Sequence, residues 1–154
     1  MATFRDNAGH EWVITVIVDA IKRVRSLLQV DLVECVTGDL WSRIVDDPVL
    51  LANIVYVLCK PQADAAKVSD EDFGKAMFAD PLAAALEALQ EELVNFFPSH
   101  QRVALVAKLI AVAEKVMTQT KADRDMLNRI ASTPPEPGVG SSDSPGSSGS
   151  TPAP

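Results

Sequence analysis

Pro48-Val49-Leu50-Leu51-Ala52-Asn53-Ile54-Val55-Tyr56-Val57-Leu58-Cys59-Lys60 is the stretch that decides the fold. Between its ends only Asn53 is strongly polar, so a helix formed by it is apolar on every face. Such a helix is buried inside a protein or inside a membrane. The stretch is several residues shorter than the roughly 20 apolar residues that span a bilayer. We therefore predict a helix at the centre of a domain core.

The ends of this stretch carry helix start and stop signals. Asp47 can cap the free N–H groups of the first turn, and Pro48 suits the first helical position. Lys60 stands where the helix dipole favours a cation, and Pro61 biases the chain to stop there. These signals predict a helix from Pro48 to Lys60.

The composition limits the class of protein and its partners. The 154 residues allow one domain with a real core, and the low aromatic content of 5% predicts an aliphatic, helical one. The formal charge of −7 argues against nucleic acid or an anionic membrane as the partner. Cys35 and Cys59 form no CxxC motif and lie in apolar surroundings, which predicts two inert buried thiols in a reducing cytoplasm. The first residues lack the layout of a signal peptide, so we expect a cytosolic protein.

Residues 3–17 have the pattern of a β-hairpin. Two β-prone runs, Thr3-Phe4-Arg5 and Glu11 to Val16, flank the turn-rich Asp6-Asn7-Ala8-Gly9. Alternation then places Trp12, Ile14 and Val16 on one face. A lone hairpin is marginal in water, so this face must pack against helices or another chain.

Short helical patterns follow the hairpin. Asp19 is a candidate cap for a helix with an apolar stripe of Ile21, Val24, Leu27 and Leu28. The basic residues between them, Lys22, Arg23 and Arg25, indicate a solvated face rather than a phosphate site. Asp31 and Asp39 can each begin a short helix before the core stretch, and residues 62–68 after it are typical of a loop or a weak turn of helix.

Two further helices have clear starts. Ser69-Asp70-Glu71-Asp72 is a helix start whose Phe73, Met77 and Phe78 should face the core. Its acids do not fit an EF-hand, because the glycine falls at the fifth loop position instead of the sixth. Asp80-Pro81 opens the strongest helical pattern, to Phe97, with one face formed by Leu82, Ala85, Leu86, Leu89, Leu93 and Phe96.

The next helix, from about His100 to Thr120, carries two apolar stripes. The Val103 stripe consists of Val103, Val106, Ile110, Ala113 and Met117. The Leu105 stripe beside it consists of Leu105, Leu109, Val112 and Val116. The helix could pack against two neighbours of its own domain. Alternatively, one stripe closes the core and the Val103 stripe is a surface for self-association or for a partner helix.

The organisation that follows is mainly α: a helical domain over residues 1–132 with the N-terminal hairpin, and a tail. Residues 121–132 are a last amphipathic turn or two. From Thr133 to Pro154 the chain is almost wholly Pro, Gly, Ser and Thr, which predicts a disordered tail over residues 133–154.

The sequence contains no set of residues that indicates catalysis. His10 and His100 are the only histidines, and no Ser/His/Asp or Cys/His set, phosphate-binding glycine loop or metal-ligand cluster can be assembled. Glu91 and Glu92 diverge by about 100 degrees on a helix, so they are not an acid/base pair. We expect a protein that is not an enzyme, with no catalytic residue, cofactor, metal or small-molecule substrate.

Five short segments resemble the tail assembly chaperones of long-tailed bacteriophages and prophages. The first is residues 4–12, whose Asp6, Gly9 and Trp12 match the Asp-x-x-Gly-Arg-x-Trp openings of that family, with His10 in place of Arg. The others are residues 18–24, 46–51, 60–64 and 69–74. Together they cover roughly residues 4–98 and consist of turns, caps and core positions, so they bring no catalytic residue.

The resemblance implies a helical protein in the host bacterial cytoplasm that binds the long, hydrophobic tape measure protein before the tail tube forms around it. It also implies departure before the virion is complete, and in such genes a frameshift often makes a second, longer product. The alternatives are an unrelated helical interaction module, for example a homodimeric adaptor or regulator, and a structural component of the phage particle.

Overall fold

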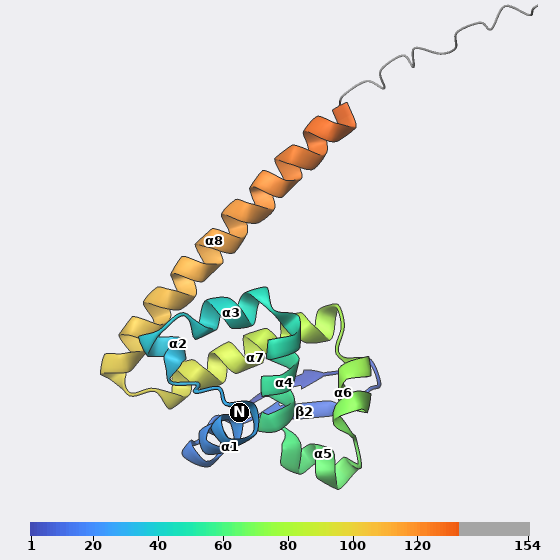
Figure 1. The fold of residues 1–154 in the computed structure, drawn as a ribbon, viewed down its shortest axis with the longest axis vertical. Helices are drawn as coiled ribbons and strands as arrows, with labels where there is room; N and C mark the ends of the chain where they lie inside the picture. The colour runs from blue at the N-terminus through green and yellow to red at the C-terminus, as the bar shows by residue number, and fades with distance from the viewer. Residues whose placement is uncertain (133–154) are drawn as a thin grey trace, which may run out of the picture. The chain divides into compact units, whose positions relative to one another are not determined.

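The computed structural model describes residues 1–132, which form eight helices and one two-stranded hairpin (Figure 1). In chain order the elements are β1 (Ala2–Arg5), β2 (Glu11–Ile14), α1 (Val18–Leu28), α2 (Glu34–Thr37), α3 (Leu40–Asp46), α4 (Pro48–Leu58), α5 (Lys60–Ala66), α6 (Asp70–Ala76), α7 (Asp80–Phe96) and α8 (Ser99–Ser132). The predicted fold class, mainly α with an N-terminal hairpin, is confirmed.

The described residues divide into two units. The first is Met1–Lys115, and the second begins at Val116. The predicted boundary between a domain over residues 1–132 and a disordered tail over residues 133–154 stays a prediction, because the tail lies outside the described residues.

The hairpin forms where the alternation places it. β1 and β2 are antiparallel, with Ala2 opposite Ile14 and Arg5 opposite Glu11, and residues 15–17 lead on to α1. Trp12, Ile14 and Val16 are buried on one face, as expected. Both strands contact α7, which supplies the apolar cover that an isolated hairpin lacks.

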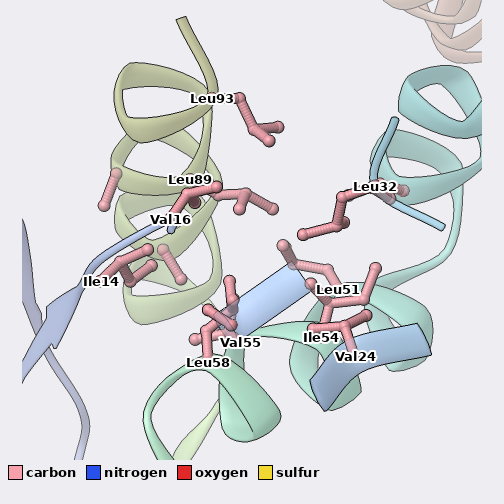
Figure 2. Packing of buried hydrophobic residues seen from close by; sticks show 14 of the residues in the cluster. Ile14, Val16, Val24, Leu32, Leu51, Ile54, Val55, Leu58, Leu89 and Leu93 are labelled. Atoms are coloured by element: carbon pink, nitrogen blue, oxygen red, sulfur yellow. The ribbon is translucent and has the colours of Figure 1, made fainter. Parts of the chain in front are cut away.

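Helix α4 lies at the centre of the first unit and contacts α1, α3, α5, α6 and α7. The Asp47 carboxylate accepts hydrogen bonds from the N–H groups of Val49 (3.0 Å) and Leu50 (3.2 Å), and Pro48 occupies the first turn, as predicted. Figure 2 shows the aliphatic cluster around α4. Its labelled members are Ile14, Val16, Val24, Leu32, Leu51, Ile54, Val55, Leu58, Leu89 and Leu93, all buried.

The C-terminal end of α4 differs from the prediction. The helix ends at Leu58, and Lys60 begins α5 instead of closing α4. Pro61 lies in the first turn of α5, where a missing N–H breaks no helical hydrogen bond. Residues 62–66, predicted as a loop or weak turn, are therefore the body of a regular short helix.

Three smaller predictions were wrong. Ile17, not Asp19, is the N-cap of α1; Asp19 lies in the first turn and pairs with Arg23 at 3.0 Å. Leu27 is exposed instead of packing in the core with Val24. Phe78 is also exposed, whereas Phe73 and Met77 are buried as expected.

Helices α6 and α7 follow their sequence signals closely. The Ser69 hydroxyl accepts a hydrogen bond from the N–H of Asp72 (3.1 Å), which confirms the predicted cap of α6. Ala85, Leu89 and Leu93 of α7 are buried, and Leu82, Leu86 and Phe96 are partly buried against the core. The N-cap of α7 is Ala79, one residue before the predicted start.

Candidate functional site

The most distinctive surface of the first unit is an exposed apolar face on α8. Val103 is 73% exposed, Ile110 54% and Val106 36%, and Ala113 is exposed as well. Helical spacing of three and four residues places these four members of the Val103 stripe on one face. The structure thus brings four of the five predicted partner-binding residues together at the surface.

The neighbouring stripe on the same helix has the opposite environment. Leu105 and Leu109 are buried in the core, and Val112 is partly buried against it. One stripe therefore closes the core of the first unit, and the Val103 stripe is left over. The alternative in which both stripes pack inside the domain does not hold for residues 103–113.

Two polar contacts fix how the start of α8 sits on the first unit. The Arg102 guanidinium Nε donates to the carbonyl of Val94 (2.8 Å), beyond the α7–α8 turn. The Lys108 ammonium donates to the carbonyl of Gly38. Lys108 is the only charged residue between Val103 and Ala113, and this contact turns it toward the domain. The exposed face of this segment is consequently uncharged.

Met117, the fifth predicted residue, belongs to the second unit and is 74% exposed. That unit also exposes Val116, Met126, Leu127 and Ile130. The last three lie in residues 121–132, which the sequence predicts as a last amphipathic turn or two outside the two stripes, so they were not among the candidate residues.

The structure also contains a groove that sequence reasoning missed. It has a volume of about 580 Å³ and is lined by the hairpin turn, the end of α5 and the segment from α6 to Phe78. One wall comes from the hairpin turn and the others from residues 66–78, far from the turn in the sequence, so no local pattern could reveal the groove.

The titratable groups that the sequence singled out have structural roles. Burial raises the pKa values of the Cys35 and Cys59 thiols to about 12, and neither is in a disulfide, so the predicted burial of both thiols is confirmed. Among residues 1–132, no three His, Cys, Asp or Glu side chains gather closely enough to hold a metal ion. Nor does any helix in this range have the length and apolarity needed to cross a membrane.

The residues that carry the family resemblance also act structurally. Asp6 and Gly9 form the hairpin turn, and Trp12 is buried beneath it. Asp47 and Ser69 cap α4 and α6. Comparison with known proteins found no matching family model, no similar curated protein and no similar solved structure.

Proposed function

We propose that this protein binds an apolar helical segment of another polypeptide on residues 103–113 of the Val103 stripe, and that it is a phage tail assembly chaperone whose partner is the tape measure protein. The observation that carries the proposal is the contrast within residues 103–113 of α8 between the buried Leu105 and Leu109 and the exposed, uncharged face of the Val103 stripe. The family resemblance supplies the identity of the partner and the setting, the host bacterial cytoplasm.

The physical support is the cost of exposing such a face. Each Å² of apolar surface removed from water is worth about 25 cal/mol, so Val103, Val106 and Ile110 lower the free energy when a partner covers them. Grouped apolar side chains at a protein surface mark interaction sites more often than scattered ones do. A tape measure protein is long and rich in hydrophobic helices, which matches an uncharged helical face.

The second candidate is a homodimeric adaptor that uses the same face. An uncharged apolar stripe has no repulsion against a second copy of itself, so α8 can pair with α8 of another chain. A structural component of the phage particle is the third. Both use the Val103 stripe. A homodimeric adaptor differs from a chaperone because its bound partner is a second copy of the chain. A structural component differs because it stays in the particle.

Co-expression with fragments of a tape measure protein tests the proposal. We expect the wild type to keep the fragments soluble, and the complex to survive about 0.5 M salt because apolar burial is not screened. The double variant Val106→Lys with Ile110→Lys should lose this activity while keeping the helical circular dichroism. Val18→Lys with Leu27→Lys, at exposed apolar positions of α1, is the matched control and should behave as wild type.

The outcomes separate the candidates. No solubilisation by the wild type rules out the chaperone function. A monomer–dimer equilibrium in sedimentation velocity that the double variant abolishes, without any tape measure binding, favours the homodimeric adaptor. The same protein in purified particles favours a structural component.

A further inference from the structure

The groove beside the hairpin turn is separate from α8 and has its own chemistry. Asn7, Ala8 and His10 form one wall, Lys67 and Val68 at the end of α5 form another, and Asp72, Lys75 and Phe78 complete it. Its volume of about 580 Å³ falls in the range of about 300–1,000 Å³ that is usual for ligand pockets.

Phe78 lies at the edge of this groove, and the position of its backbone keeps its side chain at the surface. It is 58% exposed, although the sequence places it beside the buried Phe73 and Met77. The Asn7 side-chain amide donates to the carbonyls of Ala76 (3.0 Å) and Phe78 (2.9 Å), which ties this segment to the hairpin turn. The aromatic ring is therefore held at the surface by a hydrogen-bonded corner.

The residue after Phe78 is strained. Ala79 has φ 60° and ψ −127°, a region in which side chains with a Cβ are rare and which costs about 1–3 kcal/mol. The other two non-glycine residues with positive φ in residues 1–132 are Gln29 and Lys67, and both end helices in the ordinary left-handed conformation. Ala79 has no such explanation, and strain of this kind gathers at ligand-binding sites.

The charge of the groove differs from that of the chain. Its charged side chains are Lys67, Lys75 and Asp72, with His10 beside them, whereas the chain as a whole carries −7. Lys67 has no ion pair among the described residues. Lys75 pairs with Glu71 at 3.1 Å, but both side chains are at least 70% exposed, and such a pair is worth at most about 1 kcal/mol. A carboxylate entering the groove can take the place of Glu71.

From these observations we infer that the groove binds an acidic, extended peptide segment of a partner protein that carries an apolar anchor residue. The anchor packs on Phe78 and Val68, and the flanking carboxylates pair with Lys67 and Lys75. This site goes beyond the proposed function, because it shares no residue with the Val103 stripe.

Three labelled synthetic peptides test the inference by fluorescence anisotropy on the full chain. Each has serine at every second position, and the residues between the serines are aspartate–leucine–aspartate in the first, lysine–leucine–lysine in the second and aspartate–serine–aspartate in the third. In an extended peptide this spacing puts the leucine and its flanking charges on one face. We expect saturable binding of the leucine–aspartate peptide alone, with shifts of the amide resonances of Ala8, Val68 and Ala76.

Matched variants locate the site. Lys67→Glu should weaken binding about tenfold, a change of about 1.4 kcal/mol, and Phe78→Ser should weaken it similarly. Lys22→Glu and Leu27→Ser, at exposed positions of α1, are the charge and apolar controls and should bind as wild type. Val106→Lys with Ile110→Lys should also bind as wild type, which keeps this test independent of α8.

Several results would overturn the inference. The first is the absence of binding. Equal binding of all three peptides would indicate non-specific adhesion, and full binding of the serine–aspartate peptide would indicate a simple anion site. Equal weakening by Lys22→Glu and Lys67→Glu would indicate a general effect of net charge.

Discussion

The Asp6 carboxylate accepts a hydrogen bond from the indole N–H of Trp12 at 2.8 Å, beneath the hairpin turn. Its other oxygen accepts from the backbone N–H groups of Ala8 and His10, both at 2.9 Å. One buried side chain thus closes the turn and anchors the largest aromatic residue of the hairpin. Burial alone would raise the pKa of Asp6, but these hydrogen bonds and the nearby His10 lower it below the ordinary value of an aspartate.

Asp6→Asn should lower the free energy of unfolding by about 1–3 kcal/mol at pH 7. The charged carboxylate becomes a neutral amide with one oxygen, so one of the three N–H groups that Asp6 binds is left without an acceptor. The folded-state pKa of Asp6 lies below the unfolded value, so its contribution is complete above about pH 5 and is lost as the pH falls through the folded pKa. Urea unfolding from pH 7 to pH 3 should show that the difference in free energy of unfolding between wild type and variant decreases as the pH falls. Asp19→Asn, which removes an exposed pair, should change stability by less than about 1 kcal/mol. If the difference in free energy of unfolding did not change with pH, the ionised Asp6 carboxylate would not be what stabilises the hairpin turn.

Gly9→Ala and Gly74→Ala should have opposite effects. Gly9 has φ 88°, and a Cβ there would meet nothing within 4 Å, so alanine costs only backbone strain, about 1 kcal/mol. Gly74 lies inside α6 with equally open space, so alanine there should stabilise the protein by about 0.5–1 kcal/mol. Thermal unfolding of both variants checks the signs, and two changes of the same sign would contradict the turn geometry.

Leu51→Asp or Val55→Asp should prevent folding, because an unpaired buried charge costs several kcal/mol, which is comparable to the whole stability. Val49→Asp is the matched control on the same helix. Val49 is 66% exposed and lies in the first turn, where the helix dipole favours an acid. Soluble yield and melting temperature are the measurements. A soluble Val55→Asp variant with an unchanged melting temperature would remove α4 from the core.

Leu105→Lys and Val106→Lys differ by one position on α8 and should differ in outcome. Leu105 is fully buried, so lysine there should cost several kcal/mol, whereas Val106 lies on the exposed stripe and should tolerate it within about 0.5 kcal/mol. Chemical denaturation measures both. Equal destabilisation would place the Val103 stripe inside the core and withdraw it as a binding face.

Ala79→Gly should stabilise the protein by about 1 kcal/mol, because glycine adopts φ 60° without steric strain. Ala83→Gly, in the first turns of α7, should instead destabilise it by up to about 1 kcal/mol. Differential scanning calorimetry can resolve both shifts. Loss of stability in Ala79→Gly would show that the corner before α7 is unstrained.

Local signals in the sequence were sufficient for much of this fold. The Asp47-Pro48 pair, the Ser69 cap and the alternation at Trp12 and Ile14 each specify a structure within a few residues, and each is confirmed. The sequence predicted a helix to about Thr120 and a last amphipathic turn or two over residues 121–132, whereas α8 continues without a break to Ser132. The residues after Thr120 are more polar, so the pattern did not indicate a continuous helix.

Features that depend on contacts between residues far apart in the chain could not be predicted from the sequence. Glu92 is buried on α7, and its Oε1 lies 3.0 Å from the ammonium group of Met1, an ion pair with no further hydrogen bond to that oxygen. No pattern around Glu92 indicates this. The positive φ of Ala79 could not be predicted either, because alanine disfavours that backbone conformation. The groove beside Phe78 depends on both the hairpin turn and α5, so it exists only after the chain has folded.

The link from Asn7 to Ala76 and Phe78 also sets an order of events during synthesis. The hairpin leaves the ribosome first, but its cover, α7, and the carbonyls that Asn7 binds are made about 70–90 residues later. At about 5–20 residues per second, the hairpin waits for several seconds with Phe4 and Trp12 uncovered. The first unit can close only when α7 has emerged, so a ribosome paused before Asp80 would carry a chain that cannot yet fold.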